Sequence, residues 1–350
     1  MSSELWSRSI VQLTRVRFLD FIRQPEAVFW TFVFPVLLTV GLGLAFRSRA
    51  PDKPKVGVVS VPAAGVDVVA LLGRDSNLVV VPLEDSAAAR ALRTSKVSIV
   101  VIAESGTGVR YVYDRDRSES VRARLVVDRA IQVGAGRADP VAVTERYVTE
   151  KGSRYIDFVV PGLLGLNLMS SGIWGIGFAI VDSRGKRLLK RFMATPMSRA
   201  EYLLSFLLSR IFFLIFEVVT LLGFGALAFG VPLRGSLIEL SLISLVAAMT
   251  FGAIGLLVGA RARTVEGVSG LMNLVMLPMW IFSGVFFASS NFPDAVQPLI
   301  RILPLTAVND ALRANMLEGT PITALGFETS VIVFWLVVTF AAALKLFRWR

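Results

Sequence analysis

Six long apolar runs divide the chain into membrane-like and polar parts. Each run holds about 20 apolar residues, the length needed to cross a hydrocarbon core roughly 30 Å thick. We predict six membrane-spanning helices, at residues 27–46, 158–181, 203–230, 236–260, 267–287 and 325–343. The first, second and fifth runs contain no charged residue. The pattern is therefore that of an α-helical polytopic membrane protein.

The segment between the first two spans, residues 47–157, has a different periodicity. Short β-branched runs alternate with stretches whose apolar residues recur at helical spacing. The predicted strands are 56–59, 78–81, 97–102 and 109–113, and the predicted helices are 66–72, 85–93 and 118–133. We therefore expect an inserted α/β domain with the order β-α-β-α-β-β-α. It has no Gly-rich phosphate loop and no paired carboxylates, which favours gating, substrate contact or partner docking over catalysis.

Lys and Arg are distributed unevenly among the short polar segments. One set of segments holds 15 of them in 60 positions, and a second set holds 3 in 42. The first set is 1–26, 182–202, 261–266 and 344–350, and the second is 231–235 and 288–324. Because cytoplasmic loops carry the basic excess in membrane proteins, both termini are predicted to be cytoplasmic. The inserted α/β domain is then extracytoplasmic.

Composition agrees with the membrane class. The chain of 350 residues is 54% hydrophobic and 18% charged, with a mean hydropathy of +0.66. Its net charge of +11 could suit a nucleic acid, but the basic residues flank the spans, which favours membrane lipid as the partner and no nucleic acid. The chain has no Cys and no His, which excludes thiol nucleophiles, disulfides and His-based acid–base chemistry. We predict no catalytic, cofactor or metal site.

Two basic amphipathic stretches are predicted on the cytoplasmic side. One is residues 1–26, which we expect to lie along the inner leaflet. The other is in the connection 182–202, where apolar Leu189, Phe192 and Met193 recur at helical spacing beside basic residues such as Lys186. Thr195 and Pro196 end this short helix, because a residue before proline leaves helical geometry. We expect it to serve either as an interfacial anchor on anionic lipid or as a lever that fits a partner's groove. The sequence pattern alone favours neither.

Charged and polar residues inside spans are expensive, so each one suggests a role. Glu217 lies near the middle of the third span, with Arg210 two turns earlier on a similar face. In one interpretation Arg210 snorkels to the inner headgroups and Glu217 is protonated or hydrogen-bonded between helices. In the other, the two residues lie on a translocation path or a permease dimer interface. For Asn273 in the fifth span, a packing role is favoured over a substrate role.

Two small-residue motifs are candidates for close helix packing. They are Gly255-x-x-x-Gly259 and Ser171-x-x-x-Gly175. A third feature lies near the end of the fifth span, where Ser283 and Gly284 permit close helix approach or a local break. Beyond them, prolines that include Pro293 and Pro304 divide an apolar stretch into pieces too short to span. We expect residues 288–324 to form a re-entrant or interfacial hairpin on the outer face.

Three stretches together resemble the permease subunit of an ABC-2 type transporter, in the branch with six spans and a large outer domain after the first. They are residues 17–46, with Arg-Gln-Pro before the first span; LLKRFMATPMSRAEYLL, similar to the family's coupling helix; and Ser-Gly-Val-Phe…Phe-Pro…Leu-Pro-Leu-Thr…Asp-Ala-Leu-Arg. The resemblance covers nearly the whole membrane part. The outer domain matches only in its position and α/β character.

The resemblance implies a subunit of an ATP-driven exporter in the bacterial plasma membrane. This chain lacks a Gly-rich phosphate loop, so ATP is expected to be used by two copies of a separate ATP-binding subunit. A second permease chain, identical or different, completes the unit. Lys186, Leu189, Phe192, Met193, Thr195 and Pro196 are the expected contacts to the ATPase. Closure of the ATPase would then be transmitted to spans two and three as a rigid-body movement.

The apolar spans favour a hydrophobic or amphipathic substrate, such as a drug-like compound or a lipid. The alternative is a membrane receptor or scaffold whose outer domain senses a ligand. Against that alternative, the predicted cytoplasmic parts amount to about 60 residues with no signalling domain.

Overall fold

The computed structural model describes residues 2–46, 53–60, 67–104, 108–137, 152–186, 199–262 and 264–347. The chain forms two compact units. One consists of Met1–Arg47 with Thr149–Arg350, and the other is Ser48–Val148. The first is helical and the second contains a four-stranded sheet. The predicted fold class, an α-helical polytopic membrane protein with an inserted α/β domain, is confirmed.

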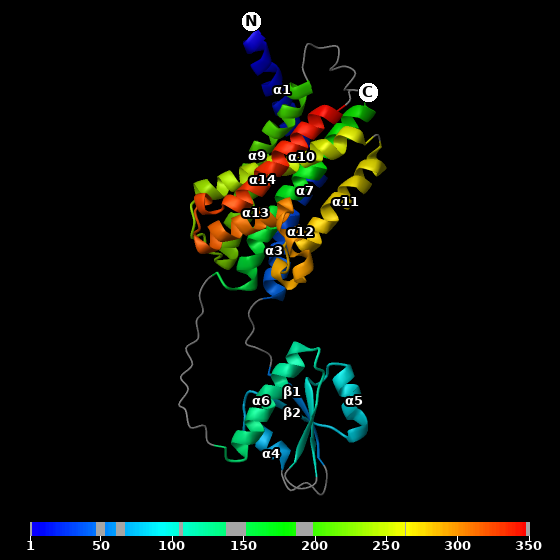
Figure 1. Cartoon of the computed structure of the whole chain (residues 1–350), viewed down its shortest axis with the longest axis vertical. Helices are drawn as coiled ribbons and strands as arrows, with labels where there is room; N and C mark the ends of the chain where they lie inside the picture. The colour runs from blue at the N-terminus through cyan, green and yellow to red at the C-terminus, as the bar shows by residue number, and fades with distance from the viewer. Residues whose placement is uncertain are drawn as a thin grey trace. The chain divides into compact units, whose positions relative to one another are not determined.

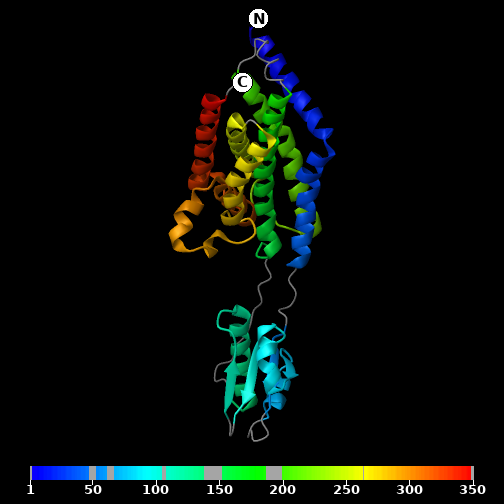
Figure 2. The same ribbon diagram turned by 90° about the vertical axis from the view of Figure 1, so that its right-hand side faces the viewer.

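Six helices of the first unit are long and apolar enough to cross a membrane. The first span combines α2 (Pro25–Val28), η1 (Phe29–Val33) and α3 (Phe34–Ala45). The others are α7 (Tyr155–Gly185), α9 (Arg199–Phe229), α10 (Leu237–Arg261), α11 (Val265–Phe282) and α14 (Gly326–Leu346). In Figures 1 and 2 α7 and α10 run through the middle of this unit, and Figure 2 shows the first span and α14 on opposite sides of them.

A separate helix, α1 (Ser2–Ile22), precedes the first span. The break between them falls at Gln24, which is extended because Pro25 follows it. The α1 helix packs against α9 through aromatic rings, with the Phe21 and Phe213 ring centroids 4.3 Å apart. Other apolar residues of α1, such as Val11 and Val16, are exposed. This basic helix therefore contacts the bundle on one side and leaves apolar surface on another.

The second span begins with an ion pair. The Asp157 carboxylate is fully buried and accepts hydrogen bonds from the backbone N–H of Gly152, at 2.9 Å, and of Arg154, at 3.1 Å. The Arg154 guanidinium also donates to it, at 2.7 and 2.9 Å. These bonds satisfy N–H groups that a helix start leaves free. The helix therefore starts at Tyr155, ahead of the purely apolar run.

Close backbone contact joins α7 and α10. A Cβ on Gly255 would lie 2.8 Å from the carbonyl oxygen of Gly172, and one on Gly259 would lie 3.2 Å from the Cα of Gly177. A side chain at Gly255 would force the helices apart, whereas one at Gly259 would require the neighbouring backbone to shift by only a few tenths of an ångström. The predicted packing motif at Gly255 and Gly259 is therefore confirmed. In the second motif, Gly175 faces open space, so its predicted packing role is wrong within this chain.

The fifth span ends earlier than predicted, at Phe282 rather than at 287. The physical reason is Gly284, whose φ of +68° is incompatible with continuing a right-handed helix. The chain then forms short pieces separated at prolines. These are η2 (Ser289–Asn291), η3 (Asp294–Val296), α12 (Gln297–Arg301), α13 (Pro304–Arg313), η4 (Ala314–Glu318) and η5 (Ile322–Ala324). Most of α13 is buried, where it contacts α7, α10 and α14.

The second unit has a mixed sheet with strand order β2-β1-β3-β4. The strands are β1 (Lys55–Val59), β2 (Val79–Pro82), β3 (Ile99–Ala103) and β4 (Val109–Val112). Strand β1 is parallel to both β2 and β3, and β4 is antiparallel to β3. With α4 (Val68–Gly73), α5 (Asp85–Arg93) and α6 (Ser118–Gly134), the observed order is the predicted β-α-β-α-β-β-α.

The helices of this unit cover both faces of the sheet, as Figure 1 shows. On one face Val56 and Ile99 pack with α4 and α6. On the other, Val59 and Val100 pack with α5. Because successive strand residues point to opposite faces, the central strands must be apolar at nearly every position. This explains the continuous apolar runs in the sequence.

Candidate functional site

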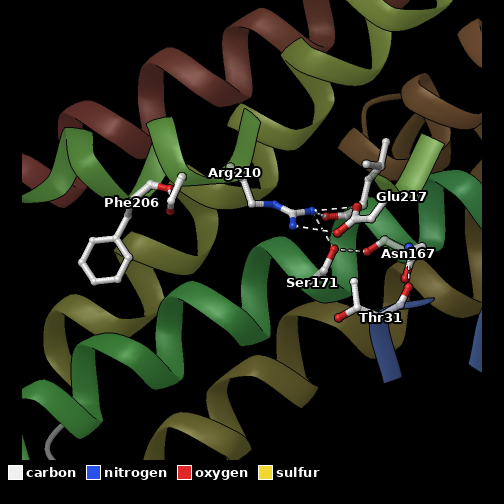
Figure 3. A network of polar contacts seen from close by, with 8 residues as sticks. Thr31, Asn167, Ser171, Phe206, Arg210 and Glu217 are labelled. Carbon is white, nitrogen blue, oxygen red and sulfur yellow. Dashed lines mark hydrogen bonds and ion pairs between the residues drawn. The ribbon is translucent and has the colours of Figure 1, made fainter. Parts of the chain in front are cut away.

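Arg210 and Glu217 form an ion pair inside the membrane unit. Both belong to α9, and only 4% of Arg210 and 1% of Glu217 is exposed. Nη1 of Arg210 lies 2.8 Å from Oε1 of Glu217, and Nη2 lies 3.1 Å from Oε2. Seven residues are about two helical turns, so the side chains share one face and meet in a bidentate arrangement. Figure 3 shows this pair in its surroundings.

The second span completes the coordination of this guanidinium. Nη2 of Arg210 also donates to Oγ of Ser171, at 2.6 Å, and to the carbonyl oxygen of Leu168, at 3.4 Å. The Ser171 hydroxyl in turn donates to the carbonyl oxygen of Asn167, at 2.5 Å. The charged pair of span three is thus attached to one turn of α7. Ser171, selected from the sequence as a packing residue, is a hydrogen-bonding partner instead.

Asn167 carries the network to the first span. Its side-chain amide donates to the carbonyl oxygen of Thr31, at 3.1 Å (Figure 3). Pro35 lies four residues after Thr31 and has no N–H to donate, so this carbonyl lacks its ordinary helical partner. In an apolar medium an unpaired carbonyl is expensive. Asn167 supplies the missing donor where η1 already departs from α-helical geometry.

The network is largely buried and electrically balanced. One positive and one negative group lie within this network, and both carboxylate oxygens of Glu217 accept from Arg210. Of the three guanidinium nitrogens of Arg210, Nη1 and Nη2 are hydrogen-bonded, and Nε has no hydrogen-bond partner among the described residues. Such a pair holds helices in register, because breaking it would leave a buried unpaired charge. Chemically, the site can pin spans one, two and three together.

This geometry corrects one interpretation of the two charges. Arg210 does not snorkel away from Glu217 but binds it directly. The pair is also buried within this chain, and a role in a translocation path or at a permease dimer interface stays a prediction. The two-turn spacing was the sequence signal for the contact. Asn167 and Ser171 were missed as its partners, although two polar residues four apart in an uncharged span indicate a shared face.

Asn273 lies apart from this network. It is exposed on α11, and its side chain makes no hydrogen bond within the described parts of the chain. The predicted packing role is therefore wrong for contacts inside one chain. The physical reason is helix rotation, because α11 buries Met272 and Met276 instead.

Two of the four predicted outer-hairpin residues, Ser283 and Gly284, lie at the end of α11 and are bound by α13. Asn309 Nδ2 donates to the carbonyl oxygen of Ser283, at 2.8 Å, and the Arg313 guanidinium donates to that of Gly284. Pro304 opens α13, where a missing N–H is harmless, and Pro293 precedes η3. Asn309 and Arg313 are four residues apart and so face the same side of α13. They bind the carbonyl oxygens of the two residues that follow the last residue of α11.

Arg313 also reaches α7. Its Nε donates to the carbonyl oxygen of Phe158, at 3.2 Å, and its guanidinium carbon lies 3.7 Å from the centre of the Phe158 ring. Burial lowers the pKa of Arg313 to about 10, while the charge of Asp310 opposes that shift. Burial raises the pKa of the Asp310 carboxyl above its usual value, and the nearby charge of Arg313 opposes that rise. Neither Asn309 nor Arg313 was selected as a site residue from the sequence.

The predicted ATPase contacts fall mostly outside the described residues. Lys186 follows the last residue of α7 and pairs with Asp182, with Nζ 2.8 Å from Oδ2. That hydrogen bond raises the pKa of the exposed Lys186 ammonium group. Leu189, Phe192, Met193, Thr195 and Pro196 lie in residues 187–198, beyond the described part. The coupling role of this segment stays a prediction.

Comparison with known families gives one match over most of the chain. The model of the ABC-2 family transporter proteins matches residues 26–345. This interval takes in all six spans and the inserted domain.

Individual relatives are more distant. A probable multidrug ABC transporter permease of Escherichia coli, YbhS, is 21% identical over 249 residues, which are 71% of this chain and 66% of the relative. The inner membrane transport permease YadH of the same organism is 22% identical over 199 residues, 57% of this chain and 75% of the relative. ABC transporter G family member 20 of Dictyostelium discoideum is 25% identical over 207 residues. That match covers 58% of this chain but only 28% of the longer relative.

Proposed function

The chain belongs to the ABC-2 family of transporter proteins, and from this membership we propose that it is the permease subunit of an ATP-driven exporter. The observation that carries the proposal is the family match across residues 26–345, which includes the inserted domain and nearly all of the membrane unit apart from α1. Two bacterial relatives named as permeases support it. The chain itself has no Gly-rich phosphate loop. ATP hydrolysis is therefore assigned to a separate ATP-binding subunit.

The proposed unit contains two permease chains and two ATP-binding subunits. Residues 186–196 form the contact to the ATPase in this proposal, because a basic amphipathic helix suits a partner's groove. Both ends of the helical unit lie on the same side in Figures 1 and 2, as an even number of spans requires. Together with the distribution of Lys and Arg, this supports cytoplasmic termini.

The proposed substrate is hydrophobic or amphipathic, taken from the cytoplasm or the inner leaflet. The apolar spans suit such a compound. The name of the YbhS relative, a probable multidrug permease, points to the same class. This chain and YbhS are 21% identical, so a substrate screen is needed to identify the compound. Hoechst 33342 and a fluorescent phospholipid are suitable first probes of the two substrate types.

The proposal is tested by co-purification. The full chain is co-expressed with an ABC ATP-binding subunit from the same genome and purified through a tag on the permease. We expect the ATPase to co-purify and to hydrolyse ATP. Phe192→Asp with Met193→Asp should remove the ATPase while leaving membrane insertion intact. Val265→Asp, an apolar-to-acidic change at an exposed position on α11, is the matched control and should retain it.

Two results would contradict parts of this proposal. One is a wild-type chain that binds no ATPase in several mild detergents, which would direct attention to ligand binding by the inserted domain. The other is the double variant retaining both ATPase and transport, which would remove the coupling role from residues 186–196 only.

A further inference from the structure

The C-terminal end of α10 lacks the usual backbone cap. The helix ends at Arg261, and its C-cap residue Ala262 has φ −66° and ψ 136°. The chain therefore leaves the helix without the left-handed residue that often pairs the last carbonyls. The last four carbonyl oxygens of a helix need outside donors. Another element must supply them here.

Arg184 of α7 supplies these donors. Its Nη1 donates to the carbonyl oxygens of Gly259, at 3.3 Å, and of Ala262, and its Nη2 donates to that of Ala260, at 3.2 Å. One half-buried guanidinium thus contacts three carbonyls of the neighbouring helix end. A cation at this position also opposes the partial negative charge of a helix C-terminus.

The two helices are already in tight contact just before this point. A Cβ on Gly259 would lie 3.2 Å from the Cα of Gly177 and 3.3 Å from the Cβ of Ile180. The glycine contacts prevent the helices from approaching further, and Arg184 ties their ends. Packed interfaces of this kind shift as units rather than deform continuously.

The position of Arg184 in the chain gives this contact its significance. It lies two residues before Lys186, the first residue of the proposed ATPase contact. The pair Asp182–Lys186 spans one further turn of the same helix end. On the other side, Ala262 is two residues before Thr264, whose hydroxyl accepts from the backbone N–H of Gly267 at the start of α11.

We propose that Arg184 is a positioning residue that makes α7 and α10 move as one body when the ATPase displaces the segment after Lys186. This inference rests on the proposed function, and it differs from a movement of spans two and three together. Arg184 acts through the three carbonyls it binds and touches no substrate. A displacement of the segment would reach span four and the start of span five directly.

The chain has no Cys, so two introduced cysteines can test the movement without background. In Ile180→Cys/Gly259→Cys the Cβ atoms would lie about 3.3 Å apart, close to disulfide geometry. Copper phenanthroline oxidises the pair in the purified complex with the ATPase. We expect ATP hydrolysis by the cross-linked complex to stay within twofold of the reduced complex. Inhibition by the disulfide that dithiothreitol reverses would overturn the proposal.

The role of Arg184 itself is tested by the rate of that cross-link during ATP turnover. We expect Arg184→Gln to slow it at least threefold, because the helix ends separate in part of the cycle. Arg184→Lys should recover part of the rate, since one ammonium group can still bind the carbonyls. Arg261→Gln removes an exposed charge at the same helix end and should change nothing. An unchanged rate in Arg184→Gln, or an equal loss in Arg261→Gln, would contradict the assignment.

A second measurement covers the case in which the cysteine pair does not assemble. Nitroxide labels on Gly185→Cys and Arg261→Cys, both exposed, report the distance between the helix ends. In the complex we expect the same distance without nucleotide and with ATP and vanadate. A nucleotide-dependent change would overturn the proposal. Failure of the wild-type chain to bind any ATPase would instead refute the proposed function.

Discussion

The carboxylate of Glu217 and the guanidinium of Arg210 meet in a bidentate ion pair, with N–O distances of 2.8 and 3.1 Å, two turns apart on a single buried helix face. Their contact is local in sequence, but the groups around it are not. Ser171 comes from another span, and Asn167 extends the network to Thr31 in a third. A polar network therefore connects three membrane helices.

Removing one charge of this pair should be much worse than removing both. Glu217→Gln leaves the Arg210 charge without its counter-ion, which typically destabilises a protein by about 3–5 kcal/mol. Arg210→Met/Glu217→Met replaces the pair with apolar groups and should be close to neutral. Thermal unfolding of the purified chain in one detergent compares the three proteins. Equal losses in the single and the double variant would argue against a buried ion pair.

The same variants separate a structural role from a role in transport. If the double Met variant folds like wild type and still transports Hoechst 33342 in the reconstituted complex, the pair holds helices and does no more. If it folds but transports at least tenfold less, charge at this position belongs to the transport cycle. Transport by the wild-type complex, measured in the same vesicles, is the reference for both results.

The bond from Asn167 to Thr31 should depend on Pro35. Asn167→Leu leaves the Thr31 carbonyl without its donor and should destabilise the chain by about 1–3 kcal/mol. Pro35→Ala restores a backbone N–H four residues after Thr31, so the same Asn167→Leu change should then cause a smaller loss. A double-mutant cycle by thermal unfolding measures the difference. Additive losses would mean that Pro35 does not create the need for Asn167.

The glycines of α7 and α10 should differ sharply in their tolerance of a methyl group. Gly255→Ala would place a Cβ 2.8 Å from the carbonyl oxygen of Gly172, and overpacking of this kind destabilises by about 1–3 kcal/mol. Gly175→Ala adds the same methyl where nothing lies within 4 Å, and Ala is favoured over Gly in a helix by roughly 0.5–1 kcal/mol. Opposite shifts in melting temperature are expected, and shifts of the same sign would disagree with the packing.

The inserted domain should lose stability at high pH through Tyr111. Burial, together with a 3.0 Å hydrogen bond to Asp128, raises the pKa of Tyr111 to about 12, and Arg124 opposes the shift. The unfolded chain then loses this proton near pH 10 and the folded chain near pH 12. The contribution of the Tyr111 hydroxyl to the free energy of unfolding is fully present below pH 10 and disappears as the pH rises towards 12.

Tyr111→Phe should reduce that decline, because the titrating hydroxyl is absent. Unfolding of the full chain, followed by circular dichroism between pH 9 and 12, measures it. Tyr113→Phe, a neighbouring position of the same unit, controls for loss of a ring hydroxyl. An identical pH dependence in wild type and Tyr111→Phe would refute the assignment.

Much of the fold follows from the sequence because its causes act locally. The thickness of a bilayer sets the length of an apolar run, so the six spans could be located from residue type alone. In the inserted domain, β-branched runs and helical spacing predicted the observed order of strands and helices. The close packing of α10 at Gly255 and Gly259 was also predicted from their four-residue spacing. The error at the end of span five came from Gly284, whose positive φ a hydropathy pattern does not contain.

The sequence by itself determined that the chain crosses a membrane six times, carries an α/β insertion and resembles ABC-2 permeases, because length, periodicity and motif are properties of neighbouring residues. Only the tertiary structure decided which polar groups meet. Asn167 and Thr31 are 136 positions apart, and Arg184 and Gly259 are 75 apart. Rotation of α11 likewise decided that Asn273 is exposed. Inside an apolar bundle, a polar side chain must find whichever carbonyl or charge the packing brings near it, and that choice depends on the relative rotation of whole helices.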